Sequence, residues 1–548
     1  MKIAQNACEN TGCMRKYMHT FVGLYKNSKD HCSGQKKVRM GNMRREIAAG
    51  ARGSNRKGVM LMKKRIGKFL VALVVTLTCL VGSSQAQRAT EVSAATASDV
   101  ATTAAAIAGR TGCLLADTQT VVLSLASATV PVTDDGILYV FALAPFQYTL
   151  SGTPIAQAPA TANPMTAFAL PDNGIYYKYV FAAKQGGAWK MLSDAQYITN
   201  PEVLATATKP FRQIPAKSWQ GLADKVFFNW FMDLPNGGAT ANTQVLQLMN
   251  SGKDPDLIHP SVYSDTYPMN KYYYMLNCSN WTGVLKVSQN VHNIAATTQT
   301  QDFIVGNEAN IREWNYTGYL GNEGYIRAYA ETVRVVYNAV KSANANARVF
   351  ICIDQNWNRP TNLYSAYEQH GYINGKEFIT TFNNLISKEG NIDWGLAIHP
   401  HTVPLTWGKF WSYSGNPYAG VYQNMIKNDY MVGFNNVTVV TNFMQSATLL
   451  NTKGQVRPII ASEIAVSASQ GEAVQAAAMY ASFYAITTNP YIEGAIYYGE
   501  YNPAAGLNSV LTPKAQEVFN NMGGPNNAAY DAYARSVIGI SSWGQVLR

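Results

Sequence analysis

Cysteine is scarce in this sequence, and the residues present form no pattern. Four of the seven cysteines lie within the first 79 residues, and Cys113, Cys278 and Cys352 are scattered through the rest. An odd, widely spaced set predicts neither a disulfide framework nor a zinc site. Cys352 lies in an apolar stretch, where we expect it only to pack against its neighbours.

Sequence signatures of several common enzyme classes are also missing. The chain has no G-x-G-x-x-G motif and no G-x-x-x-x-G-K-[ST] motif, so neither phosphate-binding loop is predicted. It has no G-x-S-x-G turn, which argues against a serine hydrolase of the α/β-hydrolase type. We find no long internal repeat, and we expect no cofactor.

Charged residues make up only 14% of the chain, and its formal charge of +11 comes from one end. Residues 1–86 hold 17 Lys and Arg against 3 Asp and Glu, whereas residues 87–548 hold 27 against 30. The main body is therefore slightly acidic. We expect it to have no nucleic-acid partner, despite the sequence pI of about 9.1.

Long hydrophobic runs are absent except in residues 60–86. A basic start precedes a 14-residue apolar run (69–82) and a small-x-small cleavage site, which is the pattern of a secretory signal peptide. A membrane-spanning helix needs about 20 apolar residues. We therefore expect a secreted, periplasmic or cell-surface protein without stable membrane insertion, with an uncleaved anchor as the alternative. Residues 1–59 would then precede the true start of translation at Met60 or Met62.

The next two segments differ in composition. Residues 87–110 are rich in Ala, Thr and Ser and predict a loose linker. In residues 111–210, short β-branched or aromatic runs alternate with turn signals such as Asp134-Asp135-Gly136 and Gly186-Gly187. This pattern predicts a small all-β, sandwich-like domain. Such a domain could bind carbohydrate, although we favour a role in bracing its neighbour.

Residues 211–525 alternate between predicted strands and predicted helices. Apolar runs predict seven strands, within 222–232, 271–277, 302–308, 347–354, 392–400, 457–464 and 492–500. Helical spacing predicts helices at 325–344 and 376–390, and an Ala-rich stretch predicts another at 471–488. Strands that are apolar on both faces and alternate with helices are typical of a parallel sheet.

The predicted fold class is therefore α/β, as a (β/α)8 TIM barrel preceded by the small all-β domain. The eighth strand is expected inside residues 278–301. Residues 526–548 would form a C-terminal tail. A doubly wound open sheet is the alternative.

Polar and aromatic residues gather where the predicted strands end. They are Asn307, Glu308, Asp354, Asn356, Trp357, His399, Glu463 and Tyr498. Because catalytic groups of a barrel lie at the C-terminal ends of its strands, we expect these residues to share one rim. Two carboxylates facing each other there are typical of a glycosidase, and Glu308 and Glu463 are the candidates. Glu500 is an alternative second carboxylate.

A metal site is a further possibility at this rim. His399 and His401 are two residues apart and could present both imidazoles to one side of the chain. The sequence shows no third ligand beside them, and we expect no metal.

The order of these motifs resembles the clan A glycoside hydrolases, retaining enzymes with Asn-Glu after barrel strand four and Glu after strand seven. More closely, the chain resembles a bacterial family of unknown function whose members are secreted, glycosidase-like proteins with a β-sandwich-like segment before the barrel. The matching strings lie within roughly residues 115–525. They are IVGNEANIREWNYTG, ARVFICIDQNWN, DWGLAIHP and IIASEIAVSA.

The resemblance implies a role for each residue. Glu308 would be the general acid/base and Glu463 the nucleophile of a retaining hydrolysis of O-glycosidic bonds in a poly- or oligosaccharide. Asn307 would bond the hydroxyl next to the anomeric carbon, and His399 would tune the carboxylate pair or hold a hydroxyl. The implied substrate-binding residues are Asn307, Trp314, Asp354, Asn356, Trp357, His399 and Tyr498.

Two departures from the family pattern leave a second hypothesis open. Ile464-Ala465 follows Glu463 where Gln-Gly is usual, and His401 stands where a Tyr is usual. The alternative is a catalytically silent carbohydrate-binding or scaffold protein built on the same barrel.

Overall fold

The computed structural model describes residues 97–205, 225–229, 245–249, 281–311, 321–360, 371–499, 501–503 and 506–548. All of them belong to one compact unit. The expected extension and signal peptide lie outside these ranges. Within them, no helix combines the length and apolar character needed to cross a membrane.

The predicted linker contains a helix. Helix α4 spans Ala97–Ile107 and packs on β1 and β2, with Ile107 buried. The prediction of a loose linker over 87–110 is therefore wrong for these residues. The physical reason is that alanine, which dominates this stretch, has the highest intrinsic helix propensity.

Two antiparallel sheets follow α4. One contains β1 (Gly112–Leu115), β2 (Thr120–Ser124) and β5 (Met165–Ala169) in that order. The other has the order β4-β3-β6-β7, with β8 paired to β6. Its strands are β4 (Ala156–Pro159), β3 (Ile137–Leu143), β6 (Lys178–Gln185), β7 (Ala188–Met191) and β8 (Gln196–Tyr197).

Local turn chemistry sets the register of these strands. Gly186 and Gly187 join β6 to β7 with φ angles of 59° and 75°, as a two-residue type I′ hairpin requires. Both carboxylate oxygens of Asp134 accept from this turn, at 2.9 Å from Gly186 N and 2.8 Å from Gly187 N. The sequence therefore located this hairpin correctly.

Apolar side chains from both sheets form one core. Val121 and Leu123 of β2 belong to the same buried cluster as Leu138 and Phe181 of the second sheet. The same cluster includes side chains of the helices and strands that follow. Two short 3-10 helices, η1 (Gly174–Tyr176) and η2 (Pro201–Leu204), pack against α7. The independence of this β segment as a domain stays a prediction.

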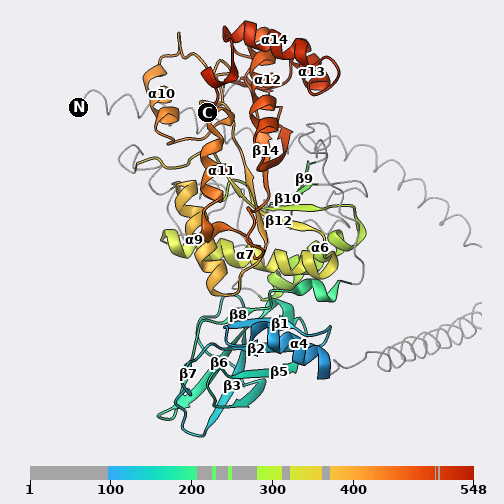
Figure 1. Ribbon diagram of the computed structural model, residues 1–548, viewed down its shortest axis with the longest axis vertical. Helices are drawn as coiled ribbons and strands as arrows, with labels where there is room; N and C mark the ends of the chain where they lie inside the picture. Colours follow the sequence, from blue (N-terminus) through green and yellow to red (C-terminus); the bar gives the residue numbers. More distant parts are fainter. Residues whose placement is uncertain are drawn as a thin grey trace, which may run out of the picture. The chain divides into compact units, whose positions relative to one another are not determined.

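A parallel sheet forms the centre of the remaining chain (Figure 1). Its strands pair in sequence order, and each pair is parallel. They are β9 (Lys225–Asn229), β10 (Val245–Met249), β11 (Asp302–Val305), β12 (Arg348–Ile353), β13 (Trp394–Ile398), β14 (Ile459–Ile464) and β15 (Ile492–Tyr497). Among the described strands β9 and β15 are edges, so barrel closure stays a prediction.

Six of the seven predicted strands are present in the described residues. The predicted strand at 271–277 lies outside the described residues, and β10 was not predicted. The expected strand within 278–301 is wrong, because helix α6 occupies Trp281–Thr297. The buried Val284, Val287, Val291 and Ile294 of α6 recur at helical spacing, which an apolar count alone does not distinguish from a strand.

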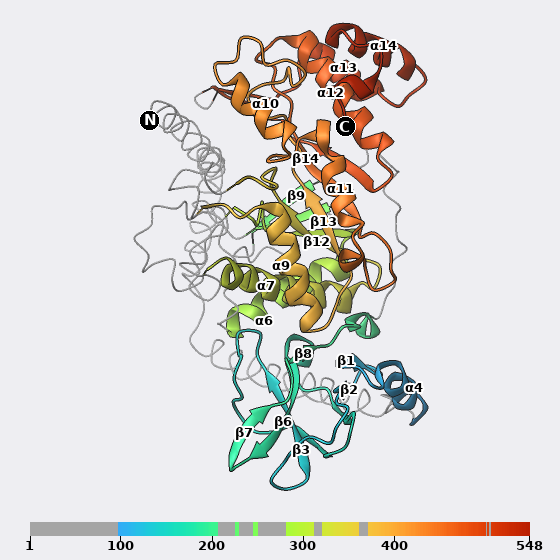
Figure 2. The same cartoon turned by 60° about the vertical axis from the view of Figure 1, so that its left-hand side comes forward.

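Helices cover one face of the parallel sheet. Helices α6, α7 (Asn322–Ala343) and α9 (Gly375–Lys388) lie side by side, as Figure 1 and Figure 2 show. Helix α12 (Glu472–Thr488) follows β14, and α13 (Pro513–Asn521) and α14 (Asn527–Ile538) pack on it. The predicted helices at 325–344, 376–390 and 471–488 correspond to α7, α9 and α12.

The remaining elements are short. They are α10 (Ala419–Lys427), η6 (Phe434–Asn436), α11 (Thr438–Met444), η7 (Ala447–Leu449), β16 (Tyr501–Asn502), β17 (Leu507–Asn508) and η9 (Trp543–Gln545). The expected tail holds α14 and η9. Trp543 of η9 stacks on Tyr484 of α12, with ring centroids 5.0 Å apart.

The two faces of the parallel sheet carry separate apolar clusters. On the face opposite the helices, β10 to β15 supply Val245, Ile304, Phe350, Cys352, Ala397, Ile460 and Ile496. Gly395 of β13 makes room for Phe350, because a Cβ at Gly395 would lie 2.5 Å from the Phe350 ring. This inner cluster forms the floor below the C-terminal strand ends.

Candidate active site

The first element of the site is the turn that follows β11. Glu308 has a φ of 46°, in the left-handed region that is uncommon for a residue with a side chain. Its N–H donates to Cys352 Sγ at 3.4 Å, and Ala309 N donates to Cys352 O at 2.7 Å. Contacts with the end of β12 therefore hold Glu308 in this unusual conformation.

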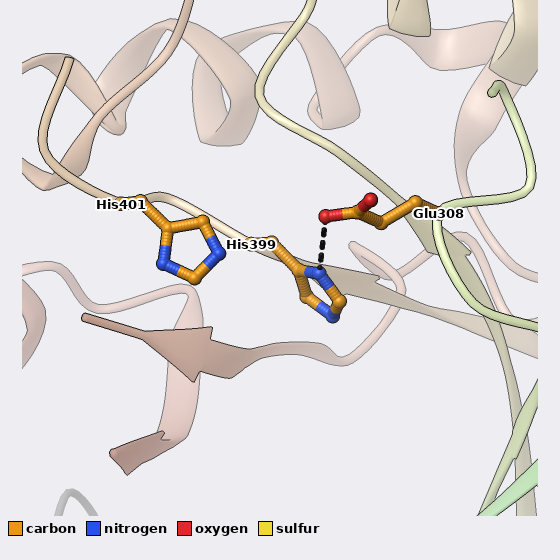
Figure 3. A group of neighbouring side chains, drawn as sticks. All are labelled: Glu308, His399 and His401. Carbon is orange, nitrogen blue, oxygen red and sulfur yellow. Dashed lines mark hydrogen bonds and ion pairs between the residues drawn. The ribbon is translucent and has the colours of Figure 1, made fainter. Parts of the chain in front are cut away.

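The second element is His399, which follows β13 and is fully buried. Its Nδ1 lies 3.0 Å from Glu308 Oε1, the contact drawn in Figure 3. The same nitrogen lies 3.6 Å from Glu463 Oε2. One imidazole thus contacts both predicted catalytic carboxylates.

Glu463 reaches this point from inside β14. The pairing of β14 with β15 is irregular between Ala461 and Ile464, which is where Glu463 lies. Such irregularities redirect side chains and are frequent beside active sites. Oε1 of Glu308 and Oε2 of Glu463 lie at most about 6.6 Å apart, since both contact the same nitrogen.

β11 and β14 are the third and sixth strands of the seven in this sheet. The resemblance placed the two glutamates after strands four and seven. The interval of three strands is kept, and the absolute count differs among the described strands.

The environment of His399 favours its charged form. Burial by itself lowers the pKa of His399, but contacts with Cys352, Glu463 and Glu308 outweigh burial and raise this pKa well above its ordinary value. The Nε2 of the ring lies 3.4 Å from Cys352 Sγ. The surroundings of His399 therefore favour a protonated ring between the two carboxylates.

A second buried carboxyl group adjoins Glu308. Asp354 accepts from Asn310 Nδ2 at 2.6 Å and from Asn356 N at 2.9 Å, and the Asn356 amide also donates to it. Burial, followed by the charge of Glu308, raises the pKa of Asp354 to about 7 although these hydrogen bonds lower it. Asp354 therefore titrates near neutral pH beside the catalytic candidates.

The chain matches one protein family over more than half of its length. Residues 229–546 match the model described as "Family of unknown function (DUF5722)". The chain belongs to this family. The match includes every predicted site residue, and the predicted resemblance to a family of unknown function is confirmed. No curated protein matches the chain.

Several solved glycosidases are similar to this member of the family, at low identity. A family 39 glycoside hydrolase from Bacteroides cellulosilyticus WH2 is 12% identical, with 71% of this chain and 78% of that chain covered and a TM-score of 0.32. A β-glucosidase from Pyrococcus furiosus is 14% identical (56% and 69% covered, TM-score 0.32). A β-glucuronidase from Bacteroides uniformis is 10% identical (77% and 49% covered, TM-score 0.28). The activity of this family member is therefore inferred from its own side chains.

Asn307 is held by a side chain of the neighbouring strand β10. Gln247 of β10 donates through Nε2 to Asn307 Oδ1 at 2.8 Å and to Gly306 O at 3.0 Å. Because the amide oxygen of Asn307 accepts from Gln247, the orientation of this amide is defined relative to Glu308 next to it.

The structure places other predicted subsite residues differently. Trp357 is 3% exposed and meets Phe443 edge to face at 5.3 Å, so its ring lies in the core rather than open to a sugar. Asn356 is also buried, and its amide bonds Asp354. The sequence analysis expected residues that follow a strand to be exposed. Here the chain after β12 turns back, and Asn356 forms an antiparallel bridge with Met431.

Two of the predicted residues cannot be placed and one is only partly accessible. Trp314 and the alternative carboxylate Glu500 lie outside the described residues. Tyr498 is half-buried, and its backbone N–H donates to Ile464 O at 2.8 Å. Tyr498 therefore lies beside the end of β14.

Sequence reasoning missed three residues that the structure brings to the site. Cys352 contacts both Glu308 and His399, although it was expected only to pack. A usable signal existed, since Cys352 lies two residues before Asp354 and therefore on the same face of the strand. Gln247 lies on the strand that was not predicted, and Asn310 lies in a turn whose partners are distant in sequence.

Among the residues that the structure describes, Glu308, His399 and His401 form a group that could hold a metal ion. Each offers one ligand atom, and these atoms all lie within 4.8 Å of one another. Figure 3 shows the three side chains together. Glu308 is thus a candidate third ligand beside the two histidines, which the sequence did not reveal.

Proposed function

We propose that this chain is a glycoside hydrolase that cleaves O-glycosidic bonds with Glu308 and Glu463. The observation that carries the proposal is the convergence of both carboxylates on one buried nitrogen, His399 Nδ1, at 3.0 and 3.6 Å. A separation of at most about 6.6 Å admits the roughly 5–5.5 Å typical of retaining enzymes and barely reaches the roughly 6.5–9.5 Å of inverting enzymes. The mechanism proposed is therefore a retaining double displacement.

In the first step Glu463 attacks the anomeric carbon as the carbon–oxygen bond to the leaving group breaks. Glu308 passes the proton held between its Oε1 and His399 Nδ1 to the leaving oxygen. This produces a glycosyl ester on Glu463. In the second step Glu308 takes a proton from water, the water oxygen attacks the same carbon, and Glu463 leaves with its electron pair.

The remaining residues support these two steps. Asn307, oriented by Gln247, is proposed to bond the hydroxyl beside the anomeric carbon. Trp314 and Tyr498 are proposed to line sugar subsites. The signal-peptide pattern at residues 60–86 supports action outside the cytoplasm on a poly- or oligosaccharide.

A carbohydrate-binding barrel without hydrolysis is the second candidate function. Ile464 and Ala465 follow Glu463 and are fully buried. Their side chains offer no hydrogen bond at a position where the resembling enzymes carry a Gln. This departure removes polar support from beside the nucleophile, which favours binding without turnover.

The test is hydrolysis of a panel of glycans and aryl glycosides by the full chain. Glu308→Gln and Glu463→Gln should each lower the rate by about 10²–10⁴. Glu517→Gln is the matched control, because this glutamate lies exposed on α13 and bonds Lys514. NMR of the first-formed sugar should show the anomeric configuration of the substrate.

Three outcomes would contradict the proposal in different ways. Hydrolysis that is unaffected by either substitution places the chemistry elsewhere. A first product of opposite configuration excludes the double displacement. Binding of a glycan without hydrolysis, with binding weakened by both substitutions, supports the second candidate.

A further inference from the structure

The position of His401 is not explained by the proposed hydrolysis. Its side chain is buried, and its ring centroid lies 5.8 Å from that of His399. His401 N donates to His399 O at 2.9 Å, which closes a tight turn around Pro400. This turn brings both imidazoles to the same end of β13.

The neighbouring chain holds this turn in place. A Cβ on Gly433 would lie 2.7 Å from His401 O, so only glycine allows this close approach. Tyr413 donates to Val403 O at 2.7 Å and holds the chain just beyond the turn. The placement of His401 beside His399 is therefore built into the packing at the C-terminal end of β13.

The three side chains form a set of ligands suited to a metal ion. One carboxylate and two imidazoles, Glu308, His399 and His401, are the ligand types that Zn²⁺ and similar ions bind. Three protein ligands leave a fourth position open, as in catalytic rather than structural zinc sites. Figure 3 shows the three side chains as neighbours, with His399 between His401 and the Glu308 carboxylate.

The distances require only a small contraction. Ligand atoms about 2.0–2.2 Å from a tetrahedral Zn²⁺ are roughly 3.3–3.6 Å from one another. Glu308 Oε1 and His399 Nδ1 are 3.0 Å apart, and no two ligand atoms of the set are more than 4.8 Å apart. A movement of about 1 Å by one imidazole or carboxylate, through side-chain torsions, would complete the geometry.

Two further groups favour a cation at this position. Cys352 Sγ lies 3.4 Å from His399 Nε2, so that this ring edge has a partner while Nδ1 faces Glu308. Partners of this kind orient metal-binding histidines. Glu463 Oε2 lies 3.6 Å from His399 Nδ1 and adds a second negative charge near the ion.

We propose that Glu308, His399 and His401 bind one divalent transition-metal ion of the Zn²⁺ class. The ion displaces the proton between Glu308 and His399 into solvent, and no bond to carbon or redox step is involved. Because Glu308 then cannot give up a proton, the bound ion inhibits hydrolysis. This second part rests on the proposed glycosidase function, whereas the metal site itself does not.

The metal site is tested by titrating the tag-free, chelator-treated full chain with Zn²⁺ in a calorimeter. His401→Ala should remove one site per chain or weaken it at least about 100-fold, since loss of an outer partner alone costs 10–100-fold. Glu308→Gln should weaken Zn²⁺ binding in the same way. His292→Ala is the matched control, because this half-buried histidine of α6 contacts Ser342. Equal binding by the wild type and His401→Ala overturns the site.

Cobalt gives an independent spectroscopic readout. Co²⁺ held by two imidazoles and a carboxylate shows visible d–d absorption without the charge-transfer band of a thiolate ligand. The absence of the thiolate charge-transfer band distinguishes the proposed site from Co²⁺ held by cysteines elsewhere in the chain. A thiolate band that disappears with the His401→Ala substitution would contradict the assigned ligands.

Inhibition is tested on any substrate that the wild type hydrolyses. Zn²⁺ should inhibit the wild type, and His401→Ala should need at least about 100-fold more ion for the same inhibition. Zn²⁺ binding through His401 without inhibition overturns the competition for Glu308. A chain that hydrolyses nothing but loses Zn²⁺ binding with His401→Ala refutes the proposed hydrolysis and supports the metal site.

Discussion

The buried carboxyl group of Asp354 makes a quantitative prediction about stability and pH. Burial, with a smaller contribution from the charge of Glu308, raises the pKa of Asp354 to about 7 from an ordinary value of 3.8. The substitution that tests this value is Asp354→Asn, which keeps the shape of the side chain and removes its titration.

The size and direction of the effect follow from proton binding. Between pH 3.8 and about 7 the folded chain holds a proton on Asp354 that the unfolded chain has released. The stabilisation from this group is thus full below pH 3.8 and is lost as pH rises through about 7. A difference of about 3 pKa units corresponds to about 4 kcal/mol in the free energy of unfolding.

Urea unfolding followed by circular dichroism between pH 4.5 and 8.5, at constant ionic strength, measures this effect. The Asp354→Asn substitution would place an NH₂ group near the amides of Asn310 and Asn356, which costs about 1–3 kcal/mol at every pH. The free energy of unfolding of the wild type should fall relative to that of the variant as pH rises from 4.5 to about 7.5. Asp194→Asn, at an exposed carboxylate near Lys388, is the control.

Parallel curves for the wild type and Asp354→Asn would refute the reasoning. They would mean that the hydrogen bonds from Asn310 and Asn356 keep the carboxylate charged despite its burial. Curves that diverge in the opposite direction would mean that Asp354 stabilises the fold as an anion.

The remaining predictions concern the inner face of the sheet and its N-terminal edge, and all are measured by urea unfolding. Gly395→Ala should lower the free energy of unfolding by about 1–3 kcal/mol, because the new methyl would lie 2.5 Å from the Phe350 ring. Gly420→Ala, in open space on α10, should change the free energy of unfolding by no more than about 0.5 kcal/mol, or raise it. Equal effects of the two substitutions would contradict this reasoning. Arg348→Met should lower the free energy of unfolding by about 3–5 kcal/mol, because the fully buried Asp302 loses the guanidinium that donates to it at 2.8 and 3.0 Å. Adding Asp302→Asn to the Arg348→Met chain should recover part of this loss. No recovery in the double variant would show that the cost is not electrostatic.

Sequence patterns were informative wherever structure is set by neighbours along the chain. The run Arg348–Ile353 is apolar on both faces, and this predicted a central parallel strand. The Gly186-Gly187 pair predicted a hairpin turn, because only residues that tolerate positive φ adopt it easily. The same logic failed for Trp281–Thr297, where short apolar runs fit a strand and a helix equally well.

The candidate site shows the same division. The positions of Glu308 and Glu463 after apolar runs predicted that both would lie at the C-terminal edge of a parallel sheet. Their meeting at His399 Nδ1 could not be predicted, because it depends on the twist of three strands and on the irregular pairing of β14. Trp357 shows the reverse case, since a residue after a strand turned into the core.

The sequence by itself determined the class of fold, the strands that carry chemistry and the residue types at their ends. These properties follow from hydrophobic period and from local backbone preference, which act over a few residues. Only the tertiary structure decided that Cys352 and His401 join Glu308 and His399, and that the pKa of Asp354 is raised. The physical reason is that contact distance and burial are set by chain segments that lie more than forty residues apart in the sequence.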